Sequence, residues 1–180
     1  MKRHLLKGTR CYLIGGMQYE NGEGWRSQVK TSLKRCGIKF FDPYLKPFIN
    51  DIPEDENARK ELLAWMAQGR LVEVAHRMRE IRTHDLRLVD LSDFLICHIR
   101  PECMSWGTQE EITTAVREKK PVFISVEGGI CKTPLWLLGM VRLGFLHGSI
   151  ESVIETVRDI DAGTFPIEDD FWKLLRPEYR

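Results

Sequence analysis

A turn followed by a helix start carries the side chains best suited to chemistry in this chain. The segment SWGTQEE, Ser105 to Glu111, follows an apolar run, Phe94 to Cys97, that predicts a buried strand. In open α/β sheets, ligands bind at turns that follow the carboxyl ends of parallel strands. A carboxylate at such a turn can serve as a nucleophile or as a general acid or base. Glu111 is therefore a candidate catalytic residue.

A second carboxylate, Asp85, interrupts an apolar stripe with the spacing of one helix face. The stripe consists of Leu71, Val74, Met78, Ile81, Asp85 and Leu88. Burying an ionised carboxylate without partners is costly, so Asp85 either pairs, for example with Arg82 or Arg87, or faces a cleft. Its neighbour His84 is expected on the surface. Two carboxylates in different surroundings suggest chemistry at a sugar carbon.

Glu111 also has a purely structural interpretation. Thr108 to Glu111 fits a capping box, with Thr108 as the N-cap and Glu111 at the N3 position. The two roles are compatible, because the dipole at a helix N-terminus favours a negative charge. A nucleophilic carboxylate needs that ionised form, so we expect Glu111 to be ionised.

The first predicted strand, Arg10 to Gly15, ends in two glycines that would let a ligand approach the backbone closely. Tyr12 lies within this strand. The turn after Gly15 and Gly16 lacks the G-x-G-x-x-G fingerprint, and the chain has no Walker A motif, so no nucleotide cofactor is expected. No cysteine and histidine set has zinc-site spacing, so no metal is expected either.

Three residues at the start of the helix after the third strand are further candidates for ligand contacts. Trp106, beside Gly107, is suited to stacking on a base, although a core or hinge role is equally compatible with its position. Ser105 is suited to bonding a phosphate or hydroxyl group, or to stabilising the turn.

Composition excludes several classes of protein. The 180 residues favour one domain, and a net charge of +1 gives no field that would attract nucleic acid or a membrane surface. No apolar run is long enough to span a bilayer, and the basic start lacks the apolar region of a signal peptide. Five cysteines without a C-x-x-C pair, with Cys11 and Cys97 inside apolar runs, predict buried thiols in a reducing, cytoplasmic compartment.

Predicted strands and helices alternate along the chain. We expect strands at 10–15, 38–41, 93–99, 121–126 and 143–146, and helices at 24–36, 60–91 in two pieces around Gly69, 108–119, 134–140 and 150–160, with an exposed excursion at 47–59. This alternation predicts a flavodoxin-like or Rossmann-like α/β three-layer sandwich, with a mostly parallel sheet of about five strands. The strands lack polar alternation, as expected when both faces of a sheet are covered.

Three blocks resemble the nucleoside 2-deoxyribosyltransferase family and the related deoxynucleoside 5′-monophosphate N-glycosidases. They are YLIGG at 12–16, DLRLVDLSD at 85–93 and GTQEEI at 107–112, within a region that runs from Arg10 to Val126. The resemblance implies a flavodoxin-like fold, with residues 1–163 as the domain, and a double displacement at the sugar C1′. It also implies a nucleoside or nucleotide as the small-molecule partner, and a homodimer or higher homo-oligomer.

The resemblance assigns roles to individual residues. Glu111 matches the nucleophile, Asp85 the acid that assists at the sugar and base, and Tyr12 the tyrosine that positions the nucleophile. The residues expected to bind substrate are Gly15, Gly16, Ser105, Trp106, Gly107 and Thr108.

The sequence departs from the transferases at two positions. Ser105 stands where some of them carry an acid that touches the base, and a serine there looks more like the monophosphate hydrolases. The transferases also use an asparagine after the fourth strand, where Thr133 is the nearest polar residue of this chain. The sequence leaves open transfer or hydrolysis, and nucleoside or monophosphate.

Two other interpretations stay open. One is a nucleotide-binding sensor or regulator that uses the same cleft without turnover. The other is a structural domain with a well-capped helix and a buried ion pair. The aromatic tail, 164–180, is expected to pack on the domain or on a neighbouring subunit.

Overall fold

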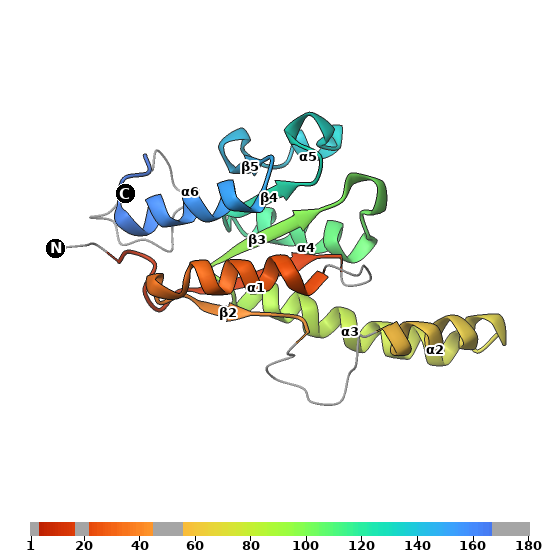
Figure 1. Ribbon diagram of the computed structural model, residues 1–180. Helices are drawn as coiled ribbons and strands as arrows, with labels where there is room; N and C mark the ends of the chain where they lie inside the picture. The colour runs from red at the N-terminus through yellow and green to blue at the C-terminus, as the bar shows by residue number, and fades with distance from the viewer. Residues whose placement is uncertain (1–3, 17–21, 45–55, 167–180) are drawn as a thin grey trace.

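The computed structural model describes residues 4–16, 22–44 and 56–166, which form a five-stranded sheet between two layers of helices (Figure 1). The strands follow the order β2-β1-β3-β4-β5, and every neighbouring pair is parallel. They are β1 Arg10–Gly15, β2 Lys39–Phe41, β3 Phe94–Ile99, β4 Val122–Val126 and β5 Leu146–His147. This order is the flavodoxin-like one, so the predicted fold class is confirmed.

The helices divide between the two faces of the sheet. They are α1 Gly22–Ser32, α2 Glu56–Ala67, α3 Leu71–Leu91, α4 Trp106–Arg117, α5 Leu135–Leu138 and α6 Ile150–Ala162. Helices α1 and α6 cover one face, and α3 and α4 cover the other. Helix α2 and the first half of α3 project past the end of the sheet (Figure 1).

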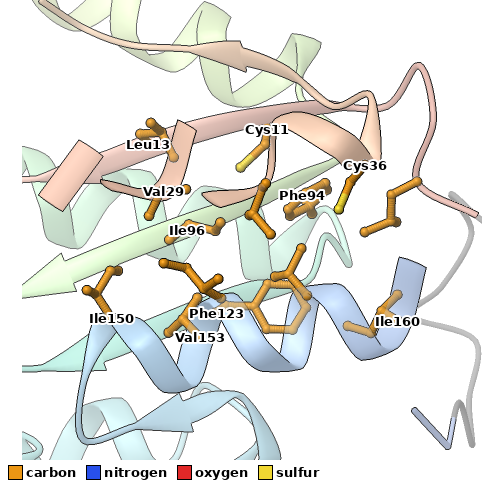
Figure 2. Packing of buried hydrophobic residues seen from close by; sticks show 14 of the residues in the cluster. Cys11, Leu13, Val29, Cys36, Phe94, Ile96, Phe123, Ile150, Val153 and Ile160 are labelled. Atoms are coloured by element: carbon orange, nitrogen blue, oxygen red, sulfur yellow. The ribbon is translucent and has the colours of Figure 1, made fainter. Parts of the chain in front are cut away.

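Strands β1, β3 and β4 each contribute buried side chains to two cores, because successive side chains of a strand point to opposite faces. In β1, Cys11 and Leu13 pack toward α1 and α6, in the core shown in Figure 2. Tyr12 and Ile14 pack in the opposite core, toward α3 and α4. The predicted burial of the strands on both faces is confirmed. The same alternation of side chains directs Tyr12 to the face on which α4 lies.

Several predicted elements need correction. Helices α2 and α3 do break at Gly69, but α2 already begins at Glu56; of the predicted excursion, residues 47–55 lie outside the described residues. The fifth strand is shorter and later than expected, because a 3-10 helix occupies Leu143–Phe145 and only the next two residues pair with β4.

The apolar stripe of α3 is covered along part of its length. Leu71 and Met78 are exposed where the helix projects, and the buried face begins at Ile81. In the tail, Phe165 packs against the core of α1 and α6. Residues 167–180 of that tail lie outside the described residues.

The end of β1 requires a glycine. Gly15 has φ +148°, and a Cβ atom there would lie 2.5 Å from the carbonyl oxygen of His98 on the neighbouring strand. We expect Gly15→Ala to destabilise the fold by about 2 kcal/mol or more, measured by urea denaturation. Gly24→Ala, in open space on α1, is the matched control and should cost nothing. Equal stabilities of the two variants would contradict the geometry at Gly15.

Candidate active site

The centre of the site is a hydrogen bond between β1 and α4. Strand β1 lies beside β3, so the helix that follows β3 packs over β1. The Tyr12 hydroxyl donates to Oε1 of Glu111 at 2.8 Å, across 99 residues of sequence. Tyr12 is 1% exposed and Glu111 is 8% exposed, so both groups are held within the protein.

The start of α4 differs from the predicted capping box. Ser105 is the N-cap: its hydroxyl oxygen accepts the N–H of Thr108 at 3.2 Å, and its backbone is extended, with φ −80° and ψ 155°. The prediction that Thr108 is the N-cap, with Glu111 at N3, is wrong because Trp106 and Gly107 are already helical. Glu111 therefore lies in the second turn of α4 and faces the interior.

Burial controls the protonation of Glu111. The pKa of its carboxyl is raised to about 8, chiefly because burial penalises the charge, and secondly because Asp85 repels it. The hydrogen bond from Tyr12 and the charge of Arg26 act in the opposite direction. The expectation that the helix dipole keeps Glu111 ionised is wrong, because desolvation in the second turn outweighs it. With a pKa of about 8, the Glu111 carboxyl is mostly protonated near neutral pH.

Asp85 lies on α3, and its charge reaches both members of the central pair. It raises the pKa of Glu111 and also that of Tyr12, for which burial is the larger cause. The side chain of Asp85 is 18% exposed, so this carboxylate is closer to solvent than Glu111 is. The two carboxyls thus have different surroundings.

The expected arginine partners of Asp85 bind other acids. Arg82 forms a two-pronged ion pair with Glu110 on α4, and Arg87 lies 3.6 Å from Asp90. Oδ1 of Asp85 instead lies 3.5 Å from Nδ1 of His84. His84 is buried, so its predicted surface position is wrong; position 84 belongs to the covered stripe of α3, three residues after Ile81.

The predicted substrate contacts lie at the ends of two adjacent strands. Gly15 and Gly16 end β1, whereas the others follow β3 at the start of α4: Ser105, Trp106, Gly107 and Thr108. The strand order reverses between β1 and β3, and this switch point is where open α/β sheets bind ligands. Trp106 is 86% exposed, which excludes a core role and leaves its ring available for stacking.

One buried cation near this site was missed from the sequence. Arg26 on α1 is 0% exposed, and its charge lowers the pKa of Glu111. Position 26 is three residues before Val29 and seven before Leu33, so it belongs to the buried stripe of its helix. A charged residue on such a stripe is the same signal that indicated Asp85.

Other chemistry is poorly supported by the described residues. No group of three or more histidine, cysteine, aspartate or glutamate side chains among them is placed to hold a metal ion. Burial raises the pKa of the Cys11 and Cys97 thiols, which keeps them unreactive. Within the same residues, no helix combines the length and the apolar character needed to cross a membrane.

Solved structures with a similar fold include those of two enzymes. No protein-family model matches the chain, and no curated protein matches it. A 2-deoxyribosyltransferase from Bacillus psychrosaccharolyticus superposes with a TM-score of 0.54 at 16% identity, covering 81% of this chain and 90% of that one. The CMP N-glycosidase BcmB from Clostridium botulinum gives 0.50 at 12% identity, with coverages of 83% and 98%.

This chain shares its fold with both enzymes. The two structures represent both groups of proteins that the sequence resembles, and the fold implied by that resemblance is confirmed. A shared fold alone does not identify the residues that carry an activity.

The hydrogen bond from Tyr12 gives a direct test of the central pair. Because this bond favours the carboxylate form of Glu111, Tyr12→Phe should raise the pKa of Glu111 above about 8 while keeping the buried ring. The measurement is an NMR titration of carboxyl-labelled glutamate, with Glu111→Gln used to assign the signal. An unchanged pKa in Tyr12→Phe would show that the hydroxyl does not act on Glu111.

Proposed function

We propose that this protein cleaves the N-glycosidic bond of a (deoxy)nucleoside or its 5′-monophosphate through Glu111, and passes the sugar to water or to a second base. The observation that carries the proposal is the buried Tyr12–Glu111 pair, with Asp85 beside it at the switch point of the sheet. The fold shared with a deoxyribosyltransferase and an N-glycosidase supports it.

The protonation of the two carboxyls suits this reaction. Because Glu111 is buried, and because Asp85 would repel its anion, the pair retains one proton near neutral pH. The reactive arrangement places this proton on Asp85 and leaves Glu111 as the carboxylate. The Tyr12 hydroxyl favours that arrangement, because it donates to the charged form of Glu111.

In the first displacement, an oxygen of Glu111 forms a bond to C1′ while the bond from C1′ to the base nitrogen breaks. The electron pair of the broken bond goes to the base, which takes the proton from Asp85. The transition state resembles an oxocarbenium ion, and the product is a glycosyl ester of Glu111.

In the second displacement, water or the N–H of another base attacks C1′ of the ester. The proton of the acceptor passes to the carboxylate of Asp85, and the ester bond breaks to release Glu111 as a carboxylate. Two displacements at one carbon retain its configuration. The site returns to its starting state with one proton.

The test is chromatography of free base from a panel of nucleosides and 5′-monophosphates, with and without a second base. Release into water alone would define a hydrolase, and formation of a new nucleoside would define a transferase. The best substrate would settle whether the 5′-phosphate is needed. Nucleotide binding without release from any substrate would overturn the proposal in favour of a sensor.

A further inference from the structure

A fully buried guanidinium lies beside the end of β1. Nη2 of Arg26 donates to the carbonyl oxygen of Gly15 at 2.9 Å, and its Nε donates to that of Leu13 at 3.3 Å. The guanidinium carbon lies 4.4 Å from the ring centroid of Trp25 and 5.2 Å from that of Tyr44. Aromatic faces at these distances stabilise a cation.

Strand β2 ends before the last residues of β1, so a side chain is needed to bond the carbonyls of those residues. The N–H of Lys39 on β2 donates to the carbonyl of Thr9, and alternate carbonyls along a strand point to the same side. The carbonyls of Leu13 and Gly15 therefore also point toward β2, but that strand ends at Phe41. Arg26 donates where the next residues of β2 would otherwise do so.

The counter-ion of Arg26 is shared. Asp42, directly after β2, lies 3.9 Å from Nε of Arg26 but 2.5 Å from Nζ of Lys30. Asp42 also accepts the N–H of Tyr44 at 3.1 Å. One carboxylate thus lies beside two cations.

The charged and titratable groups that act on Glu111 come from several elements. Asp85 on α3 and Glu110 on α4 disfavour its carboxylate, whereas Tyr12 on β1 favours it through a hydrogen bond. Cys97 on β3 is also coupled to Glu111, and its raised pKa keeps it a neutral thiol. Arg26, from α1, adds a positive charge to this otherwise acidic set.

We propose that Arg26 is a positioning residue of the site, which fixes the end of β1 below the Gly15–Gly16 turn and so holds the strand that presents Tyr12 to Glu111. Its positive charge also favours the carboxylate form of Glu111, against the repulsion from Asp85. The kinetic part of this inference rests on the proposed function, whereas the structural and electrostatic parts do not.

The experiment compares four proteins by NMR titration of carboxyl-labelled glutamate, with Glu111→Gln for assignment. Arg26→Gln can still donate a hydrogen bond but has no charge, so the pKa of Glu111 should rise by roughly half a unit to one unit. Arg26→Lys keeps the charge and should stay near the wild-type value. Lys30→Met removes the other cation of Asp42. Lys30 makes no hydrogen bond to β1, so this variant should also leave the pKa of Glu111 unchanged.

A structural role alone would predict that Arg26→Lys and Arg26→Gln behave alike, and an unshifted pKa in a folded Arg26→Gln would overturn the inference. If both Arg26 variants fail to fold, the pKa of Glu111 in Asp42→Asn tests the inference instead. This substitution removes the counter-ion of Arg26, so the pKa of Glu111 should fall, and no change would contradict the proposal.

Kinetics separate this inference from the proposed function. If the wild type releases base, its rate should decline above the pKa near 8, as the last proton of the carboxyl pair is lost, and Arg26→Gln should move this limb to higher pH with a lower kcat. If the wild type releases no base, the proposed function fails, whereas the titration still decides the role of Arg26.

Discussion

Replacing Glu111 with Gln is expected to reduce base release on the order of 10³-fold or more, because the amide cannot form the glycosyl ester. The loss should appear mainly in kcat, since the substitution leaves the shape of the side chain unchanged. The measurement is the initial rate of free base release on the best substrate of the panel. Full activity in this variant would refute Glu111 as the nucleophile.

The variant should remain folded and should still bind substrate. Glu111 is largely protonated at neutral pH, and a protonated carboxyl and a carboxamide have nearly the same shape and charge. The amide oxygen can still accept the hydrogen bond from Tyr12. Substrate should therefore still raise the melting temperature of Glu111→Gln. Glu110→Gln is the matched control, because it alters the adjacent, exposed carboxylate on the same helix and should keep its activity.

The order of the elements could be predicted from the sequence because it depends on local patterns. Apolar runs bounded by glycine and proline predicted both ends of β1 as observed, and the ends of β3 and β4 to within one residue. The helix from Leu71 to Leu91, with Ile81 and Leu88 on its buried face, followed from helix periodicity alone. Such signals lie within a few residues of one another, so no knowledge of the tertiary structure was required.

The contacts of the site could not be predicted in this way. The bond between Tyr12 and Glu111 depends on β1 lying beside β3, which is a property of strand order. The N-cap at Ser105 was missed because Thr108 and Glu111 matched a common motif three residues later. The protonation of Glu111 was misjudged for a related reason: in the second turn of α4, burial matters more than the helix dipole.

Two buried polar residues lie on helix stripes whose register decides their burial. On α3 the buried face includes His84, whereas Asp85, the next residue, is half-buried at its edge. On α1, Arg26 lies on the stripe of Val29 and Leu33, and the same spacing rule would have indicated it. The effect of Arg26 on the end of β1 would still have required the structure, because it depends on where β2 stops. Charged or polar residues on otherwise apolar stripes are the sequence signal most worth pursuing in this fold.

The raised pKa of Glu111 should make the stability of the wild type fall as pH rises. A carboxyl with a pKa of about 8 in the folded state, against 4.5 ordinarily, binds a proton more tightly when the protein is folded. Its contribution is therefore destabilising above pH 4.5 and reaches full size above pH 8. Glu111→Gln removes this penalty. Its free energy of unfolding should therefore exceed that of the wild type by roughly 3 to 5 kcal/mol at pH 9, and by little at pH 4.5.

Urea denaturation of both proteins between pH 4.5 and pH 9 measures this difference. Glu110→Gln again serves as the control: its ion pair with Arg82 is exposed, so the change in stability should be within about 0.5 kcal/mol. Glu110 has the smallest influence on the pKa of Glu111, so the fall in stability with rising pH should remain. Parallel curves for the wild type and Glu111→Gln would mean that Glu111 titrates normally in the folded protein. A gain in stability with a loss of base release would instead identify Glu111 as a residue retained for reaction at a cost to the fold.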